Sequence, residues 1–165
     1  MVTLGVCSEI GIDGDKAGVS GMKEGERISQ EELIAEALRA RDRAYAPYSR
    51  FRVGAALACD DGRVYTGCNI ENASYPAGIC AERVALHTAV ASGSRRVTAL
   101  AVVSDSDDPC YPCGICAQVI SELAPDVAVI LVKEGSDRRQ ILQFRGTDLL
   151  RMAFGPEHLR VDSDE

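Results

Sequence analysis

The feature that most constrains the fold of this chain is the placement of its cysteines. Cys110, Cys113 and Cys116 stand in one short run, DDPCYPCGICAQVI, and Cys80 stands well upstream in SYPAGICAERVAL. If these thiols bind one metal ion or cluster, the two segments must meet in the folded chain. Four kinds of site are open on this pattern: an iron–sulfur cluster, a redox disulfide, a structural zinc site and a catalytic zinc site.

Helices are predicted around both cysteine segments. The stretches 79–93 and 113–124 are apolar at helical spacing, and each is followed by a helix-stopping glycine or proline. A third helix is predicted over 29–45, because Ser29 and Glu32 form a capping-box pattern just before an apolar run.

Strands are predicted between these helices. A hairpin is expected over 51–67, since two apolar runs flank the turn sequence Asp-Asp-Gly. Strands alternating with helices indicate an α/β sandwich, one sheet flanked by helices. The remaining expected elements are strands at 97–104, 127–132 and 139–144 and a short C-terminal helix at 147–154.

The length and charge of the chain limit its organisation and partners. With 165 residues we expect one domain at 29–160, a flexible N-terminal extension at 1–28 and an acidic C-terminal tail at 161–165. A net charge of −7 argues against a nucleic-acid polymer as partner, because such a surface needs a basic patch. The expected partner is a small molecule or a second copy of the chain.

No secretory signal is expected at the N-terminus, and the longest apolar run is only strand-sized. We therefore predict a cytoplasmic protein without a membrane partner, whose seven cysteines are reduced. We then expect some of these thiols to bind a metal ion or to take part in catalysis.

An iron–sulfur cluster and a redox disulfide fit the pattern less well than zinc. An iron–sulfur run has a further cysteine where this chain has Ile120. A redox C-x-x-C pair normally follows the first strand of its unit, whereas Cys113 comes after two helices and three strands. Both alternatives also leave the segment Cys80-Ala81-Glu82 unexplained.

Zinc explains more of the pattern. Cys113 and Cys116 lie one turn apart at a predicted helix start, and Cys80 opens another helix. Cys110 stands in a segment that Pro112 biases towards an extended form, so we predict that it is a bystander. Three protein ligands leave a fourth position for water, which is the catalytic arrangement, whereas four would make a structural site.

Two charged residues follow Cys80 directly. Arg83 lies three residues on, on the same helical face, where it is either a hydrogen-bond donor to the sulfurs or a surface residue. Glu82 supplies a carboxylate beside the metal, as general acid–base catalysis requires. A ligand-x-Glu segment followed by P-C-x-x-C is the pattern of zinc deaminases, and the spacing alone supports such an enzyme without fixing its substrate.

Three sequence blocks carry a resemblance to a known family. They are AYAPYSRFRVGAAL at 44–57, GCNIENASYPAGICAER at 67–83 and LLRMAFGPEHL at 149–159. Together with the cysteine motifs they resemble the small, homotetrameric, zinc-dependent cytidine deaminases of the cytidine/deoxycytidylate deaminase family, from about Ser29 to Leu159. The resemblance implies a three-layer α/β/α sandwich with one mixed sheet of about five strands.

The resemblance also implies an activity, the hydrolytic deamination of cytidine and deoxycytidine to uridine and deoxyuridine in pyrimidine salvage. In this family one zinc ion per chain is held by three thiolates, here Cys80, Cys113 and Cys116. Zinc-bound hydroxide attacks the cytosine ring, and Glu82 shuttles the protons.

Further site residues are implied only by the resemblance. Asn69 and Glu71 match residues that bind the ribose, and Phe51 matches an aromatic that packs on the base. In the family, neighbouring subunits complete one another's sites. The implied substrate-binding residues are Phe51, Asn69, Glu71, Ala73, Tyr75, Ala81 and Phe154, with Arg83 beside the ligands.

Two alternatives remain on the sequence: a deaminase of a modified or antibiotic cytosine nucleoside, and, more weakly, a redox or iron–sulfur protein. The chain also departs from the family at Ala117, where an arginine usually follows the last cysteine. This departure removes a positive charge near the zinc or at a subunit contact.

Overall fold

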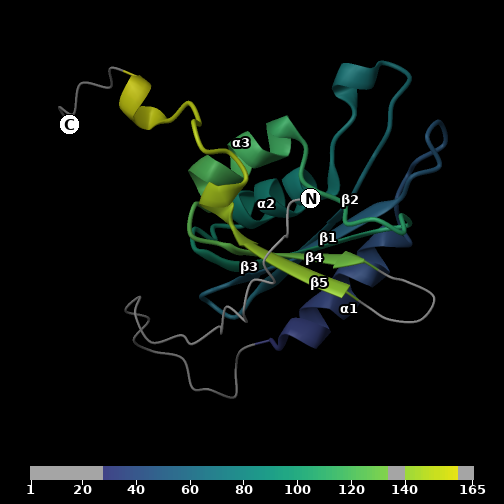
Figure 1. Ribbon diagram of the computed structural model, residues 1–165, viewed down its shortest axis with the longest axis horizontal. Coiled ribbons are helices and arrows are strands. Elements are labelled where there is room, and N and C mark those ends of the chain that lie inside the picture. Colours follow the sequence, from purple (N-terminus) through teal and green to yellow (C-terminus); the bar gives the residue numbers. More distant parts are fainter. Residues whose placement is uncertain (1–27, 134–139, 160–165) are drawn as a thin grey trace, which may run out of the picture.

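The computed structural model describes residues 28–133 and 140–159 as one mixed sheet with helices on both faces (Figure 1). The sheet has the strand order β2-β1-β3-β4-β5. Only β3 and β4 are parallel neighbours, and the other pairs are antiparallel. The strands are β1 (Val53–Cys59), β2 (Val64–Cys68), β3 (Val97–Ser104), β4 (Ala128–Lys133) and β5 (Gln140–Arg145). The predicted α/β fold with a five-stranded mixed sheet is confirmed.

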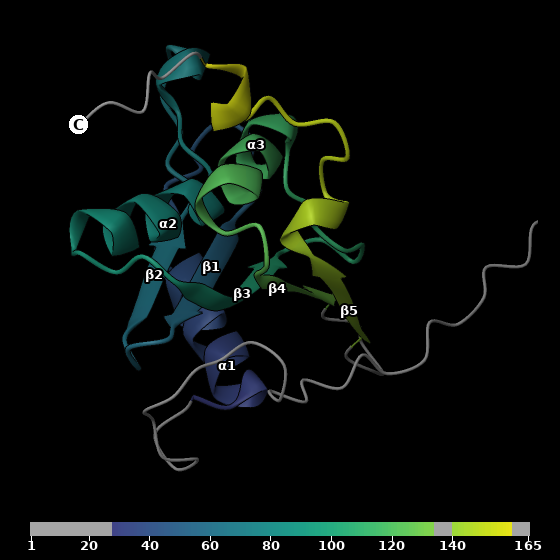
Figure 2. The ribbon, with the colours of Figure 1, turned by 90° about the vertical axis from the view of Figure 1, so that its left-hand side faces the viewer.

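Helix α1 (Gln30–Arg41) covers one face of this sheet, and α2 (Ala81–Ala91) and α3 (Gly114–Leu123) cover the other (Figure 2). Successive residues of β1 pack on opposite faces of the sheet. Ala55 and Leu57 pack with the α2 and α3 side, whereas Ala56 and Ala58 pack with the α1 side. The core therefore has two layers, one on each side of the sheet.

The first helix begins where its capping box predicts. The Ser29 Oγ accepts from the Glu32 backbone N–H at 3.3 Å, and the Ser29 N–H donates to the Glu32 carboxylate at 2.9 Å. The helix ends at Arg41, earlier than the predicted 45. Tyr45 instead pairs with the loop after β2, since its N–H donates to the Asn69 carbonyl at 3.0 Å.

The predicted C-terminal helix over 147–154 is wrong. This segment instead contains the single 3₁₀ turn η2 (Gly146–Asp148), and a further turn, η3 (Pro156–His158), follows it. Eight residues form too short a helix to be stable without a packed face, and no residue of 147–154 is buried. The segment between β2 and the next helix contains a third short turn, η1 (Tyr75–Ala77).

The predicted extension and the acidic tail fall outside the described residues, apart from Ile28. No helix in the two described ranges is both long and apolar enough to cross a membrane.

Helix α2 lies unusually close to β2. A Cβ atom on Gly67 would stand 2.4 Å from the Ala81 carbonyl oxygen and 2.6 Å from the Ala85 backbone nitrogen. Small α2 residues pack in this region, with Ala81, Ala85 and Ala89 all fully buried. This contact sets the position of the first turn of α2, which carries Glu82 and follows Cys80.

We predict that Gly67→Ala destabilises the protein by about 1–3 kcal/mol or more, because the added methyl group overlaps the α2 backbone. Urea unfolding measures this change in the free energy of unfolding. Gly114→Ala is the matched control, since no other atom lies within 4 Å of the place that its methyl group would take; its expected change is within about 0.5 kcal/mol. Equal midpoints for the two variants would contradict the prediction.

Candidate metal and catalytic site

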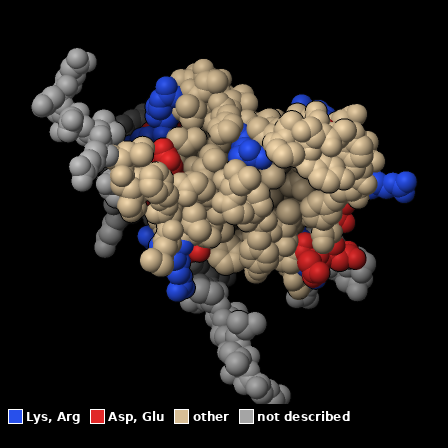
Figure 3. Space-filling view, turned by 90° about the horizontal axis from the view of Figure 1, so that it is seen from above, with Lys and Arg blue, Asp and Glu red and all other residues tan. Residues whose placement is uncertain are grey.

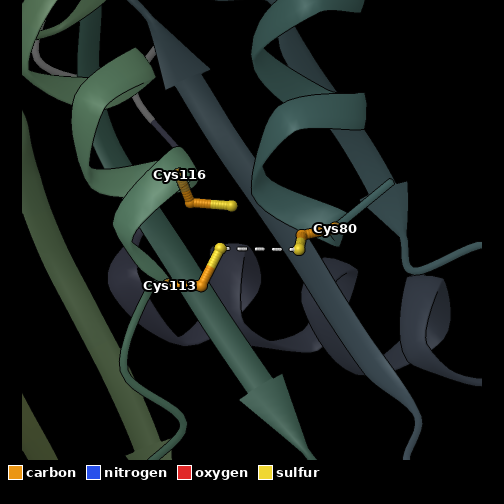
Figure 4. Close-up of side chains that lie close together, drawn as sticks. All are labelled: Cys80, Cys113 and Cys116. Atoms are coloured by element: carbon orange, nitrogen blue, oxygen red, sulfur yellow. Dashed lines mark hydrogen bonds between the residues drawn. The ribbon is translucent and has the colours of Figure 1, made fainter. Parts of the chain in front are cut away.

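Two helix starts bring three cysteines together. Cys80 is the N-cap of α2 and Cys113 is the N-cap of α3, and Cys116 lies in the first turn of α3. Both helices pack on the same face of the sheet, so their N-terminal ends meet above it. Figure 4 shows the three side chains pointing toward one another from α3 and from the start of α2.

The three sulfur atoms lie within 4.8 Å of one another, and those of Cys80 and Cys113 are 3.8 Å apart. This spacing suits zinc, because two sulfurs at about 2.3 Å from a tetrahedral ion are about 3.8 Å apart. Cys116 is buried, Cys80 is half-buried and Cys113 is exposed, so the group opens to solvent on one side. Three soft thiol ligands with one open side fit a zinc ion that keeps a free position.

The electrostatics favour a negative charge on this group. The pKa of Cys80 is lowered to about 5, mainly because the Cys116 thiol donates a hydrogen bond to it and also because Arg83 lies nearby. The same contact raises the pKa of Cys116. The helix N-termini at Cys80 and Cys113 add positive potential. Cys80 is therefore the thiol that ionises first.

Arg83 is directed at the group rather than at solvent. Its Nη2 lies 4.0 Å from the Cys80 sulfur and donates to the Gly78 carbonyl at 3.4 Å. Its Nε is buried and has no hydrogen-bond partner among the described residues. Of the two interpretations of Arg83 from the sequence, the structure favours the donor to the sulfurs.

Glu82 is the one charged residue in the described ranges that is buried, with 4% of its surface exposed. Burial raises the pKa of its carboxyl, and the charge on Cys80 raises it further. It forms no ion pair among the described residues. A carboxyl group whose pKa is raised in this way accepts a proton more readily than an exposed glutamate, as a proton carrier must.

Cys110 stays outside the three-sulfur group. Its side chain packs against the core layer under α2 and α3. Burial raises the pKa of its thiol to about 11, so it remains protonated. The structure thus separates the three cysteines of the run as the sequence predicted.

Asn69 fixes the start of β1. Its Oδ1 accepts from the Val53 N–H at 2.8 Å, and its Nδ2 donates to the Phe51 carbonyl at 2.8 Å. Asn69 therefore has a clear structural role, since its side chain bonds the backbone of a segment sixteen to eighteen residues away rather than that of its own turn. Its contact with ribose stays a prediction.

Glu71 holds the neighbouring loop. Its Oε2 accepts from the N–H groups of Tyr48 at 2.8 Å and Ser49 at 3.2 Å, and the Ser49 hydroxyl donates to its Oε1. These bonds lower the pKa of Glu71. The Ser49 Oγ in turn accepts from the Phe51 N–H at 3.0 Å, so Glu71 and Phe51 are linked.

Sequence reasoning did not single out Ser49 or Tyr48. The only available signal was their place inside the block AYAPYSRFRVGAAL, because the bonds to Glu71 join segments more than twenty residues apart.

The remaining implied residues are not all brought to the sulfur group within one copy. Ala81 is buried at the start of α2, whereas Ala73 is exposed and Phe51 is 39% exposed. Tyr75 in η1 is 79% exposed. Phe154 lies in residues 149–159, called the C-terminal segment below, and is 57% exposed. Figure 1 shows η1 and the C-terminal segment well apart, on either side of α3 and the start of α2.

Comparisons with known proteins point to the same kind of site, a zinc-binding region. Residues 27–132 match the family model described as the cytidine and deoxycytidylate deaminase zinc-binding region. A cytidine deaminase from Halalkalibacterium halodurans is 48% identical over 133 residues, which cover 80% of this chain and 98% of the relative. One from Sporosarcina psychrophila is 56% identical over 92 residues, 56% of this chain and 68% of the relative.

Two solved structures are also similar to this chain. The crystal structure of a cytidine deaminase from Burkholderia pseudomallei aligns with a TM-score of 0.72 at 46% identity, and covers 77% of this chain and all of the other. A cytidine deaminase from Mycobacterium tuberculosis aligns with a TM-score of 0.65 at 40% identity, over 78% of this chain and 98% of the other.

We predict about one zinc ion per chain, held by the three-sulfur group. Cys113→Ser and Cys80→Ser should lose most of the zinc, because a serine hydroxyl is a much poorer zinc ligand than a thiolate. Cys110→Ser should keep it, since Cys110 lies outside the group. Metal analysis of purified protein measures all three. Loss of zinc from Cys110→Ser, or iron in the wild-type protein, would contradict the assignment.

Proposed function

The chain belongs to the cytidine and deoxycytidylate deaminase family, and from this premise we propose that it deaminates cytidine and deoxycytidine to uridine and deoxyuridine. The observation that carries the proposal is the buried Glu82 carboxyl beside three converging cysteine sulfurs. Hydrolytic deamination needs a water-derived nucleophile at neutral pH and a group that moves protons, and this arrangement provides for both.

Cys80, Cys113 and Cys116 would hold the zinc ion, which when bound supplies an activated water molecule as nucleophile. Glu82 takes the proton of that water on its carboxylate. It gives this proton to the ring nitrogen of cytosine. It then takes the remaining proton of the same water from the hydroxyl group that has added to the ring, and gives it to the amine that leaves as ammonia. Its raised pKa supports this role, since the carboxyl must both accept and donate near neutral pH.

Arg83 balances the charge of the site. Three thiolates and one zinc ion carry a net charge of −1, which opposes the ionisation of bound water. A guanidinium 4.0 Å from the Cys80 sulfur reduces this opposition, and no arginine at position 117 shares the task. Arg83 therefore provides a larger share of the compensating positive charge here than in the usual family pattern, which has an arginine at position 117.

Substrate recognition is proposed to involve the loops beside the helix starts. The Ala81 backbone and Glu82 would hydrogen-bond the pyrimidine, and Asn69 and Glu71 the ribose hydroxyl. Phe51 is held beside them by the bonds from Ser49 and Asn69. Because Glu71 already accepts three hydrogen bonds from the loop at 48–49, its position is fixed before any substrate binds.

We further propose a homotetramer in which neighbouring copies complete one another's sites with Ala73, Tyr75 and Phe154. The face that carries η1 and the C-terminal segment is mostly uncharged (Figure 3). Large apolar side chains are exposed on both segments, with Met152 94% exposed. Uncharged, apolar exposure of this kind is typical of a protein–protein contact.

A role in pyrimidine salvage follows from the reaction, which returns cytosine nucleosides to the uracil nucleoside pool. We propose the cytoplasm as the location, because all six cysteines in the described ranges are free thiols.

We predict that the zinc-loaded protein converts cytidine and deoxycytidine with release of ammonia, and that Glu82→Gln lowers the rate by about 10²–10⁴-fold or more while zinc is retained. The loss of cytidine absorbance, an ammonia assay and metal analysis measure this. Glu122→Gln, an exposed residue on α3, is the charge-matched control and should keep the wild-type rate.

No product from either nucleoside by fully zinc-loaded protein would refute the proposed substrate, and turnover of only modified cytosine nucleosides in a panel would favour the alternative. A near-normal rate for Glu82→Gln would remove this residue from proton transfer.

We predict that mixing two impaired variants restores activity if sites are shared. Glu82→Gln lacks the proton carrier, and Phe154→Ala lacks the aromatic that a neighbouring copy would supply. In a mixed tetramer, some sites combine a native Glu82 with a native Phe154. After co-refolding or subunit exchange, a fraction of activity with the wild-type KM should return. Its complete absence in demonstrably mixed oligomers would show that each copy supplies its own site.

A further inference from the structure

The C-terminal segment is tied to α3 at one backbone position. The Gln118 Nε2 donates a hydrogen bond of 2.6 Å to the Phe154 carbonyl oxygen. Gln118 comes two residues after Cys116 on the same helix. A single helix therefore carries two cysteines of the sulfur group at its first turn and the anchor of Phe154 in its next turn.

A second contact holds the ring of Phe154. The His158 ring stacks on it, with the centroids 5.1 Å apart and the planes at 23°. The His158 Nδ1 also accepts from the Gly155 N–H at 3.0 Å, which fixes the imidazole against the turn η3. The histidine thus covers one face of the Phe154 ring and is itself held in place.

Neighbouring apolar residues do little to hold this segment. Met152 is 94% exposed and Leu159 is 55% exposed. The Phe154 ring remains 57% exposed although its carbonyl and one ring face are in contact. An aromatic ring held at its backbone and on one face, with the rest presented to solvent, is prepared for contact with something outside this copy.

We propose that Gln118 and His158 are positioning residues that set the orientation of Phe154 for contact with the nucleoside in a neighbouring copy's site. This inference rests on the proposed function, in which Phe154 completes that site. Gln118 fixes the backbone and His158 fixes the ring, so little ordering is left to occur when the nucleoside binds. Helix α3 then serves two sites, its own through the cysteines and the neighbour's through Gln118.

The test is the kinetics of Gln118→Met in the zinc-loaded oligomer. Methionine keeps the length of the side chain and removes the donor. We expect KM for cytidine to rise about five- to tenfold, the order of one lost hydrogen bond, with kcat within about twofold of wild type. Zinc content and oligomeric state should not change. Gln143→Met is the matched control, since Gln143 bonds to Gln30 and lies away from Phe154.

A double-mutant cycle separates positioning from a general structural effect. In a Phe154→Ala background, Gln118→Met should cause no further rise in KM. His158→Phe keeps a stacking ring and should raise KM less than His158→Ala. An unchanged KM for Gln118→Met, or an equal rise in the Phe154→Ala background, would overturn the inference while cytidine turnover by the wild-type protein leaves the proposed function standing. An unchanged KM for Phe154→Ala itself would refute the shared site and the inference together.

Discussion

The site depends on how closely α2 can approach the sheet. Gly67 has no side chain to hold the helix away, and a methyl group there would overlap the α2 backbone at Ala81 and Ala85. The resulting short distance places the N-cap Cys80 next to the start of α3, where Cys113 is also an N-cap. A larger residue in this contact would move Cys80 and Glu82 together. The packing of α2 on the edge strand β2 therefore helps to determine whether the three sulfurs can meet.

Bringing three thiols and a carboxyl into one place concentrates negative charge. Few positive groups of the fold compensate for this charge. Two helix N-termini point at the sulfurs, and Arg83 is the one side chain in the described residues that contacts them with a positive charge. Position 117, where a family arginine is usual, holds a buried alanine. The balance favours an ionised Cys80, as a metal ligand must be, and raises the pKa of Glu82, so that its carboxylate accepts a proton more readily than that of an ordinary glutamate.

Features set by local sequence could be predicted, and features set by distant contacts could not. The capping box at Ser29 and the helix starts at the cysteines depend on a few neighbouring residues, so the sequence indicated them. The family resemblance added the substrate residues, but not the contacts that hold them. The bond from Gln118 to Phe154 and the loop bonds of Glu71 join separate segments. The predicted C-terminal helix failed for the same reason: apolar spacing suggested a packed face, while the chain there is held through Gln118 and left largely exposed.

Within one copy of the chain, the residues proposed for catalysis lie apart from the aromatic residues proposed to cover the substrate. The groups that would hold zinc and move protons lie on two helices packed against a rigid sheet, and their positions follow from the core. Tyr75 and Phe154, by contrast, lie on exposed turns beyond the sheet. Catalytic geometry tolerates only errors well below about 1 Å, which suits a core-anchored site, whereas an aromatic that covers a substrate must be brought up from outside it. If a neighbouring copy supplies that aromatic, assembly closes the pocket without any loop having to fold over the nucleoside, and the entropy of ordering such a lid is avoided at each turnover.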